Sequence, residues 1–501
     1  MNLASIVDHH PGERVALITS DGVVSYGALR SAVARYRARL VAAGVGPGDG
    51  VALVAPNSPA FVVAYLAILG AGAVAVPLNP ASPPSERDGQ IAAADVRAVV
   101  AGLTLERPPP DVMLLDGPTL DPPVGADRAP PGVGAAPAGG GAAAGSAVVE
   151  RDGGDVAVLS FTAGTAGAPR AAMLTHANLL ANLDQLRRHP GPRVGPDDVV
   201  LGVLPLFHVF GLNVVLGAAL VEGAAVLLAD GAGPDLLPRI VEARVSVLVG
   251  SPALYAALLA SPPARDEASG AVRLAVSGAA PCPPELGAAF RARFGVPLRQ
   301  GYGLTEASPV VTAAVDDDHP RASSVGIPVP GVELRLVDAE GADALDGDPG
   351  EVWVRGANVF GGYWRDPEAT AAVLNEDGWL RTGDIGVLGD DGQLSIVDRA
   401  KDLIIVSGFN VWPAEVEAVI LDLPGVAEAA VVGRDDPIRG EVVVGYVVLE
   451  EGVALEAEAI RAHTASRLAR YKCPIEVMIV ASLPHGLAGK LLRRALREHR
   501  R

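Results

Sequence analysis

The spacing of hydrophobic residues changes between helical and strand-like along the first hundred positions. Residues 26–43 repeat apolar side chains with the period of an amphipathic helix, whereas residues 14–18, 51–55 and 96–101 are short apolar runs typical of buried strands. Alternation of this kind predicts helices layered on sheets, which is the α/β class.

One uncharged stretch, from Val51 to Ser85, is long enough to raise the question of a membrane span. A membrane helix needs about 20 consecutive apolar residues. Gly70, Gly72 and Pro77 interrupt the run FVVAYLAILGAGAVAVP before it reaches that length. We therefore predict a buried helix followed by a strand, and no integral membrane segment.

The rest of the chain divides into three parts. After a connection at 107–145 that is rich in Pro, Gly and Ala, strand and helix patterns alternate from residue 155 to residue 300. Residues 325–400 are predicted to be rich in β-structure, and residues 403–501 to form a compact α+β domain. The predicted fold is therefore a large N-terminal domain of layered α/β subdomains with a β-rich portion, followed by a small C-terminal domain.

The net charge and the cysteine content limit which classes of partner the protein can bind and indicate its cellular location. The 501 residues carry a formal net charge of −18, which opposes binding to nucleic acid and to anionic lipid, because both need clustered Lys and Arg. The two cysteines, Cys282 and Cys473, form no CxxC motif, and the N-terminus lacks the basic and apolar regions of a signal peptide. We expect a cytoplasmic location.

A loop of small residues follows the strand pattern at 156–161 and reads TAGTAGAPR, from Thr162 to Arg170. Small residues let backbone N–H groups approach phosphate oxygens, the two threonine hydroxyls add donors, and Arg170 adds a cation. The loop is not a Walker A motif, and on composition alone an ordinary connector is the more frequent interpretation.

A second segment, GYGLTE from Gly301 to Glu306, follows another strand pattern. Its aromatic ring can stack on a base, its threonine hydroxyl can contact a phosphate, and its carboxylate can bind Mg²⁺ together with phosphates. A turn with one hydrogen-bonded acid explains the same residues equally well.

Three further positions are weaker signals when taken singly. Asp384, in the sequence TGD, could bind the hydroxyls of a ribose, but capped turns have the same composition. Lys490 precedes a basic helix and could place positive charge on a phosphoryl transition state, or it could belong to a solvated basic tail. His208, within an apolar run, is either a core residue or part of an acyl pocket walled by Val209–Leu220.

In their order and spacing these segments resemble the adenylate-forming superfamily, which contains acyl-CoA synthetases, peptide-synthetase adenylation domains and luciferases. The resemblance covers nearly the whole chain and includes SGAA at 277–280, GGYW at 361–364, DRAKD at 398–402 and VSGFNVWPAEVE at 406–417. The segments SGFNVWPAEVE and PLFHVFGLN are most similar to bacterial medium- to long-chain fatty acyl-CoA ligases.

The resemblance implies an ATP site. Contacts to the phosphates and the adenine are assigned to Thr162, Gly164, Thr165, Gly167, Arg170, Gly278, Ala279, Ala280 and Tyr302. Thr305 would contact the α-phosphate and Glu306 would bind Mg²⁺, whereas Asp384 and Arg399 would hold the ribose.

The resemblance also implies two reaction steps in two arrangements of the chain. Lys490 would bridge the acyl carboxylate and the α-phosphate in the first step, with His208 beside the carboxylate. Lys401 would lie in a hinge at 399–402, between an N-terminal AMP-binding domain at 1–398 and a mobile C-terminal domain at 403–501. Gly408 would lie beside the pantetheine arm of CoA in the second step.

The phosphate loop departs from the family pattern TSGTTGxPKG. Ala163 and Ala166 remove two hydroxyl donors, Arg170 replaces a lysine, and Ala171 replaces a glycine. The positive charge is kept but its shape changes, because a guanidinium is planar and an ammonium is a point charge.

The leading hypothesis from the sequence is an AMP-forming acid–thiol ligase for a medium- to long-chain fatty acid. It would use ATP, Mg²⁺ and CoA, release pyrophosphate and act in lipid metabolism. One alternative takes an aromatic acid, or passes the acyl group to an acyl-carrier protein or another nucleophile. An alternative of another class is a non-catalytic binder of acyl groups or nucleotides. The sequence does not determine the chain length of the acid or the acceptor of the acyl group. It also leaves the oligomeric state open, and a homodimer is one possibility.

Overall fold

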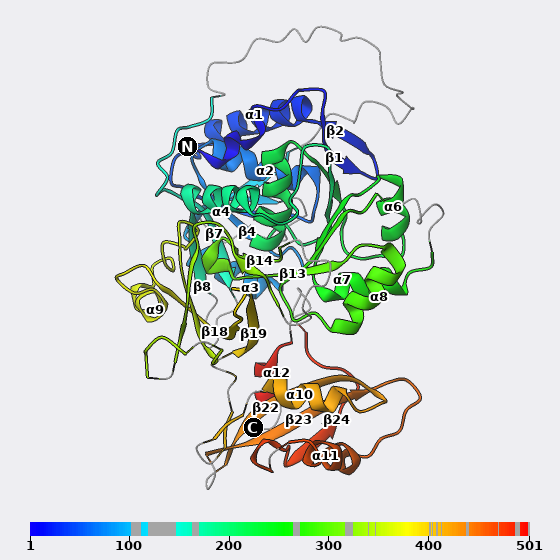
Figure 1. Ribbon diagram of the computed structural model, residues 1–501. Coiled ribbons are helices and arrows are strands. Elements are labelled where there is room, and N and C mark those ends of the chain that lie inside the picture. The colour runs from blue at the N-terminus through cyan, green and yellow to red at the C-terminus, as the bar shows by residue number, and fades with distance from the viewer. Residues whose placement is uncertain are drawn as a thin grey trace. The chain divides into compact units, whose positions relative to one another are not determined.

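The computed structural model describes the whole chain except residues 102–111, 119–146, 163–169, 264–270, 316–323, 339, 346, 400–401, 403, 407–408, 412, 437–439, 469, 486–490 and 499–501. The chain forms two compact units (Figure 1). The first comprises Met1–Ala322, Gly326–Glu333 and Arg355–Leu380, and the second comprises Ser323–Val325, Leu334–Val354 and Arg381–Arg501.

The first unit contains a nine-stranded sheet with the order β15-β14-β13-β12-β11-β9-β10-β1-β2. Its strands are β1 (Val15–Thr19), β2 (Gly22–Ser25), β9 (Val199–Gly202), β10 (Ala225–Leu228), β11 (Val247–Gly250), β12 (Leu274–Ser277), β13 (Leu298–Gly303), β14 (Val310–Ala313) and β15 (Ile327–Pro328). The neighbours from β1 through β10, β9, β11 and β12 to β13 all pair in parallel. Their carboxyl ends therefore lie at one edge of the sheet.

Three helices cover one face of this sheet (Figure 1): α6 (Leu236–Glu242), α7 (Pro252–Ala260) and α8 (Pro284–Phe294). Their apolar sides bury Tyr255 and Phe290, whose ring centroids lie 5.1 Å apart in an edge-on arrangement. Together with aliphatic residues from β9–β13 they form one core, which holds the parallel strands in place.

A second sheet of the first unit has six strands, in the order β6-β5-β3-β4-β7-β8. They are β3 (Gly50–Val54), β4 (Val74–Leu78), β5 (Val96–Ala101), β6 (Met113–Asp116), β7 (Val156–Thr162) and β8 (Arg170–Thr175). The sequence pattern did not predict β8, which pairs antiparallel with β7 and places Arg170 opposite Thr162. The loop predicted to bind phosphates therefore joins the two strands of a hairpin.

The long uncharged stretch forms helix α2 (Pro59–Gly70) followed by β4, as predicted. All residues from Phe61 to Gly70 are buried, which explains why the helix is apolar on every side. Within the described residues, no helix has the length and apolar character that a membrane span requires. The other helical segments of this unit are η1 (Leu3–Val7), α1 (Tyr26–Ala42), α3 (Pro84–Ala93), α4 (His176–Arg188), the π-helix η2 (Phe210–Gly217), α5 (Ala218–Glu222), η4 (Thr305–Ala307) and α9 (Pro367–Val373).

The second unit holds most of a four-stranded sheet made of β16 (Glu333–Val337), β17 (Gly350–Arg355), β18 (Leu380–Leu388) and β19 (Leu394–Arg399). Its other sheet has β20 (Ile404–Val406), β21 (Phe409–Val411), β22 (Val426–Asp436), β23 (Gly440–Leu449) and β24 (Glu476–Ile479). With these strands go the helical segments α10 (Pro413–Leu421), α11 (Ala457–Ala465), η6 (Arg470–Lys472) and α12 (Arg493–Glu498). The predicted β-rich portion and α+β C-terminal portion are both present, but two of the four residues of the proposed hinge, 400 and 401, lie outside the described residues, so its position at 399–402 stays a prediction.

An ion-pair cluster links the N-terminal ends, or entrances, of three parallel strands. Asp198, Ser246 and Arg273 directly precede β9, β11 and β12. The Asp198 carboxylate accepts hydrogen bonds from Ser246 Oγ at 2.8 Å and Arg273 Nε at 2.8 Å, and from the Gly195 N–H at 2.6 Å. Burial alone would raise the pKa of Asp198, but these bonds and the nearby guanidinium outweigh it and hold the pKa below its usual range.

Replacing Asp198 with Asn should lower the free energy of unfolding by about 2 kcal/mol at pH 7, because a charge-assisted network loses its anion. Since the pKa of Asp198 is depressed in the folded chain, its contribution is fully present above about pH 4 and disappears as the pH falls through the folded value. Denaturant unfolding of the variant and the wild type should therefore converge in acid.

The neighbouring Asp197 provides the matched control. Its side chain is 97% exposed and pairs with Arg14 at the surface, so Asp197→Asn should change stability by less than about 0.5 kcal/mol. Equal losses in the two variants would show that the cluster at Asp198 is not the stabilising feature.

Candidate functional site

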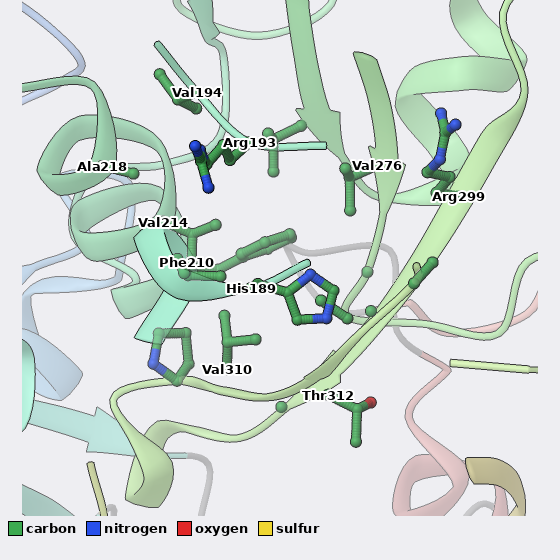
Figure 2. Close-up of a pocket in the computed structure, with 18 of the residues that line it drawn as sticks. His189, Arg193, Val194, Phe210, Val214, Ala218, Val276, Arg299, Val310 and Thr312 are labelled. Carbon is green, nitrogen blue, oxygen red and sulfur yellow. The ribbon is translucent and has the colours of Figure 1, made fainter. Parts of the chain in front are cut away.

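Three of the predicted site segments begin where parallel strands end. His208 follows β9, Gly278 follows β12, and Tyr302 lies near the end of β13. Because carboxyl ends of parallel strands share one edge, these segments meet at the kind of crevice where α/β sheets bind ligands. All three line one cavity of about 160 Å³ (Figure 2). That volume is roughly ten times the space that a single water requires.

The cavity has mostly apolar walls. Helical segments η2 and α5 contribute Phe210, Val214 and Ala218, and the strands contribute Val276 and Val310. Figure 2 shows these five side chains turned toward the same space. The segment Val209–Leu220 therefore supplies walls of this cavity, as the sequence analysis expected for an acyl pocket.

Two histidines line the cavity, and the sequence analysis identified one. His208 is exposed, and its Nδ1 accepts a hydrogen bond from the Phe210 N–H at 3.2 Å, so it is not a core residue. His189 is buried, and its Nδ1 accepts from the Gly191 N–H at 3.1 Å. Burial lowers the pKa of His189, so this imidazole is neutral at pH 7.

The glycines at this edge are required by close approach. A Cβ on Gly303 would lie 2.1 Å from the Pro309 carbonyl oxygen, and a Cβ on Gly278 would lie 3.0 Å from the Phe210 ring. Ala279 adopts φ 68, which is unusual for a residue other than glycine. Gly278 and Ala279 line the cavity, whereas Ala280 follows them without lining it.

The predicted phosphate and metal residues lie on the short helix η4. Glu306 Oε1 accepts a hydrogen bond from Tyr363 Oη at 2.7 Å. Burial, followed by the charge of Glu306, raises the pKa of Tyr363 far above its ordinary value, so the hydroxyl stays protonated and acts as the donor. Thr305 lines the cavity, and Glu306, the next residue along the chain, does not.

Tyr363 was noted in the sequence only as part of GGYW, without a role. Its segment pairs with the edge of β8, through Gly361 N–H to Met173 O at 3.1 Å and Trp364 N–H to Ala171 O at 2.8 Å. Gly362, at φ 112, has no room for a side chain because a Cβ would lie 2.6 Å from Thr370. This pairing aims the Tyr363 hydroxyl at Glu306.

Arg170, at the end of the predicted phosphate loop, is held in place on two sides. Its Nε donates to Asp366 Oδ2 at 3.1 Å, and its guanidinium lies over the Tyr363 ring, 5.8 Å from the centroid. Asp366 Oδ1 meanwhile accepts from the Ala369 N–H at the start of α9. At the other end of the loop, Thr162 Oγ1 donates to the Arg170 carbonyl at 3.4 Å. Gly164, Thr165 and Gly167 lie outside the described residues.

Buried side-chain amides hold the turn that follows Glu306. Asn182 donates to the Val310 carbonyl at 2.9 Å and accepts from the Val310 N–H at 3.1 Å, and Asn213 donates to the Ser308 carbonyl at 2.8 Å. Asn358 donates to the Ala307 carbonyl at 2.8 Å. The four polar backbone groups of this turn would otherwise be buried without partners, so these bonds determine where Thr305 and Glu306 sit.

The sequence analysis missed these amides. Asn213 was visible only as the last letter of PLFHVFGLN, and the other members carried no motif. A fourth amide, Gln185, joins them by accepting from Asn182 at 3.1 Å and donating to Asn358 at 3.2 Å. The available signal was polar residues spaced along the otherwise apolar face of helix α4, at positions 178, 182 and 185.

The predicted ribose residues belong to the second unit. Asp384, in β18, is directly opposite Arg399, in β19, in the antiparallel register. Asp384 is buried, and its N–H donates to Thr382 Oγ1 at 3.1 Å. The structure thus brings the two residues together along the backbone, and the side chain of Arg399 is outside its description.

Lys490, Lys401 and Gly408 also lie outside the described residues, but the segments beside Lys490 are anchored. Leu491 pairs with His485, and Arg493 Nη2 donates to Glu417 Oε2 at 2.8 Å. Leu496 is buried in the core of this part. The helix after Lys490 is therefore packed and ion-paired, which excludes the solvated basic tail for its described residues.

Among the described residues, no group of three His, Cys, Asp or Glu side chains could hold a metal by itself. Glu306 offers a single carboxylate, and Tyr363 engages only one of its two oxygens. One or two carboxylates together with phosphates are what Mg²⁺ commonly uses. The donor chemistry at Glu306 therefore fits a metal that binds with a nucleotide.

The chain is similar to known proteins over nearly its full length. Residues 3–364 match a family model described as AMP-binding enzyme, and residues 415–490 match its C-terminal domain. A feruloyl-CoA synthase from Amycolatopsis sp is 35% identical, with 95% of this chain and 93% of that protein covered. A 4-coumarate–CoA ligase from Nicotiana tabacum is 34% identical, with 91% and 85% covered.

Among solved structures, ATP-bound MatB from Rhodopseudomonas palustris superposes with a TM-score of 0.88 at 32% identity, over 99% of each chain. Both its large N-terminal and its small C-terminal portions are matched at this coverage. The similarity confirms the predicted fold class and the family resemblance drawn from the sequence.

Replacing Asn182 with Ala should lower the free energy of unfolding by about 2–3 kcal/mol, because the buried Val310 N–H loses its acceptor. Asp184 lies two residues away on helix α4, is 51% exposed and pairs with Arg188 in the next turn. Its replacement by Asn should change stability by less than about 0.5 kcal/mol. Denaturant unfolding of the two variants measures the difference, and equal values would contradict the importance of the amides.

Proposed function

Because the chain belongs to the AMP-binding enzyme family, we propose that it activates a carboxylic acid with ATP, releases pyrophosphate and transfers the acyl group from the adenylate to CoA. It is thus an AMP-forming acid–thiol ligase. The observation that carries the proposal is the apolar cavity lined by Thr305, which lies with Glu306 on the short helix η4. An acid that fills this cavity presents its carboxylate to the segments that match the nucleotide site.

We propose an aromatic acid as the substrate class, in preference to a medium- or long-chain fatty acid. The curated relatives described above are named for feruloyl and 4-coumarate substrates, and neither name supports a fatty acid. The cavity wall at Gly301 and Gly303 has no side chains, which leaves backbone surface against which a planar ring can lie. The apolar residues on the opposite side then supply contacts to the ring faces.

The chemistry follows from charge. A carboxylate oxygen attacks the α-phosphorus of ATP, pyrophosphate leaves, and the acid becomes a mixed anhydride with AMP as its leaving group. The transition state gathers negative charge on the phosphoryl oxygens. Arg170, braced by Asp366, and Lys490 are the cations proposed to stabilise it, and Thr305 donates a hydrogen bond to the α-phosphate. Mg²⁺, when bound at Glu306, supplies further neutralisation of the phosphates.

In the second step the thiol of CoA displaces AMP from the adenylate. Both curated relatives are named as CoA enzymes, which supports CoA as the acceptor in preference to an acyl-carrier protein. The hinge at Lys401 and the passage beside Gly408 remain part of this proposal, as do the cytoplasmic location and the homodimer. The substitutions Ala163 and Ala166 favour the alternative of a non-catalytic binder. Against that alternative, the Tyr363–Glu306 contact and the amides that position the turn are intact.

Exchange of labelled pyrophosphate into ATP tests the first half-reaction. We expect exchange that depends on an added aromatic acid such as 4-coumarate or ferulate, and weaker exchange with octanoate. Thioester formation should then require CoA. If no acid supports exchange, the result would refute the enzyme hypothesis and favour the non-catalytic binder. A strong preference for octanoate would instead favour the fatty-acid hypothesis.

Lys490→Ala separates the two steps. Adenylation should fall by about 10²–10³-fold, the range seen when one preorganised electrostatic donor is removed. Thioester formation from supplied acyl-adenylate should largely survive. The matched control is Lys472→Ala, which removes a lysine that pairs with Glu415 and should leave both rates within a few-fold of wild type. An equal loss in both steps of the Lys490 variant would refute its assignment.

A further inference from the structure

The cavity follows one face of a helix for three turns. Phe210, Val214, Ala218 and Glu222 recur every four residues along η2 and α5, and all four line it. At the helical rise per residue these twelve steps span on the order of 15 Å. Gly278 meets Phe210 at the nucleotide end, so Glu222 marks the far end, distant from the reacting carboxylate.

The far end of the cavity is polar and shares residues with a second cleft. That cleft is lined by Asp184, Arg187, Arg188, Arg193 and Glu222, of which Arg187, Arg193 and Glu222 also line the main cavity. Three guanidinium groups therefore face two carboxylates. The far end carries net positive charge, although the chain as a whole is strongly acidic.

Ion pairs account for two of the three arginines. Arg187 Nε lies 2.6 Å from Glu222 Oε1, and Arg188 Nε lies 2.7 Å from Asp184 Oδ2. Arg193 has no acidic partner within the part of the chain that the structure describes, and its Nη1 donates only to the Arg187 carbonyl at 3.1 Å. Figure 2 shows Arg193 beside Val194 at the Ala218 side of the cavity. Its other N–H groups remain available to a ligand.

The backbone at Arg193 is fixed by the cluster that joins the strand entrances. Its carbonyl accepts from Arg273 Nη2 at 2.7 Å, and Arg273 is itself bound to Asp198. A cation whose main chain is tethered in this way loses less freedom when it binds a ligand. The side chain of Arg193 is exposed, but its fixed backbone makes the position suited to recognition.

We propose that Arg193 recognises an acceptor oxygen on the substrate's aromatic ring, on the side opposite the carboxylate. The inference rests on the proposed function and narrows it to aromatic acids that carry a hydroxyl or methoxy group at the far end. A guanidinium at the end of an apolar cavity donates to such an oxygen, whereas an unsubstituted ring or an alkyl chain offers this exposed arginine no acceptor and leaves its N–H groups to water. Arg193 is thus a specificity-determining residue of the acyl site.

The test compares 4-coumarate with cinnamate, which differ by one hydroxyl, together with 4-methoxycinnamate. Dissociation constants for the acids alone come from isothermal titration, and kcat and KM come from acid-dependent pyrophosphate release. Wild type should favour the oxygenated acids over cinnamate by about 3-fold to 10-fold, as expected for one hydrogen bond to an exposed group. Arg193→Leu should bring the ratio near one through KM and Kd, and Arg193→Lys should keep part of it.

Arg188→Leu is the matched control, because Arg188 lines only the outer cleft, and it should leave the ratio unchanged. Wild type that does not discriminate, or an Arg193→Leu variant that discriminates as wild type does, would overturn the inference while the ligase function stands. Binding that depends on Arg193 without any pyrophosphate release would support the inference and refute the proposed function.

Discussion

The hydrogen bonds from buried amides to the turn after Glu306 are the constraint on which the candidate site depends. A turn at the end of a buried strand exposes N–H and carbonyl groups that the sheet no longer pairs. Asn182, Asn213 and Asn358 reach that turn from three separate segments of the chain and satisfy those groups. Because each amide is itself buried, none can relax without leaving another polar group unpaired. Thr305 and Glu306 therefore occupy a fixed position before any ligand arrives.

The two edges of the large sheet have different tasks. At the entrances of β9, β11 and β12, the Asp198 cluster ties three strands together and carries no residue of the proposed reaction. His208, Gly278 and Tyr302 lie at the carboxyl ends of β9, β12 and β13. Glycines are needed at this edge because a Cβ on Gly278 or Gly303 would come too close to neighbouring atoms. Stability concentrated at one edge permits strained or sparsely packed structure at the other. Arg193 connects the two tasks, since its backbone is held by Arg273 while its side chain faces the cavity.

Local patterns predicted most of the fold and the motifs, because the spacing of apolar residues indicates strands such as 274–277 and helices such as 284–294. The strand Arg170–Thr175 escaped prediction although its hairpin pairing with β7 is local, whereas its contact with residues 361–364 is tertiary. The missed residues make tertiary contacts of this kind. Tyr363 meets Glu306 across 57 positions of sequence, and Asn182 meets Val310 across 128. Helical spacing marks the polar face of α4 at positions 178, 182 and 185, but it does not say which distant residues that face contacts.

The acidity of the chain explains how its arginines are used. The net charge is −18, so carboxylates outnumber cations and an arginine readily finds an acidic partner. Arg187, Arg188 and Arg273 all form such ion pairs. Arg170 is also paired, through Nε to Asp366 Oδ2 at 3.1 Å, and a guanidinium engaged at Nε still carries N–H donors on its two outer nitrogens. A lysine at this position has a single ammonium group, which Asp366 and a phosphate would have to share. The change from Lys to Arg in the phosphate loop is therefore consistent with retained function, because the guanidinium can keep its acidic brace and still present donors to an anion.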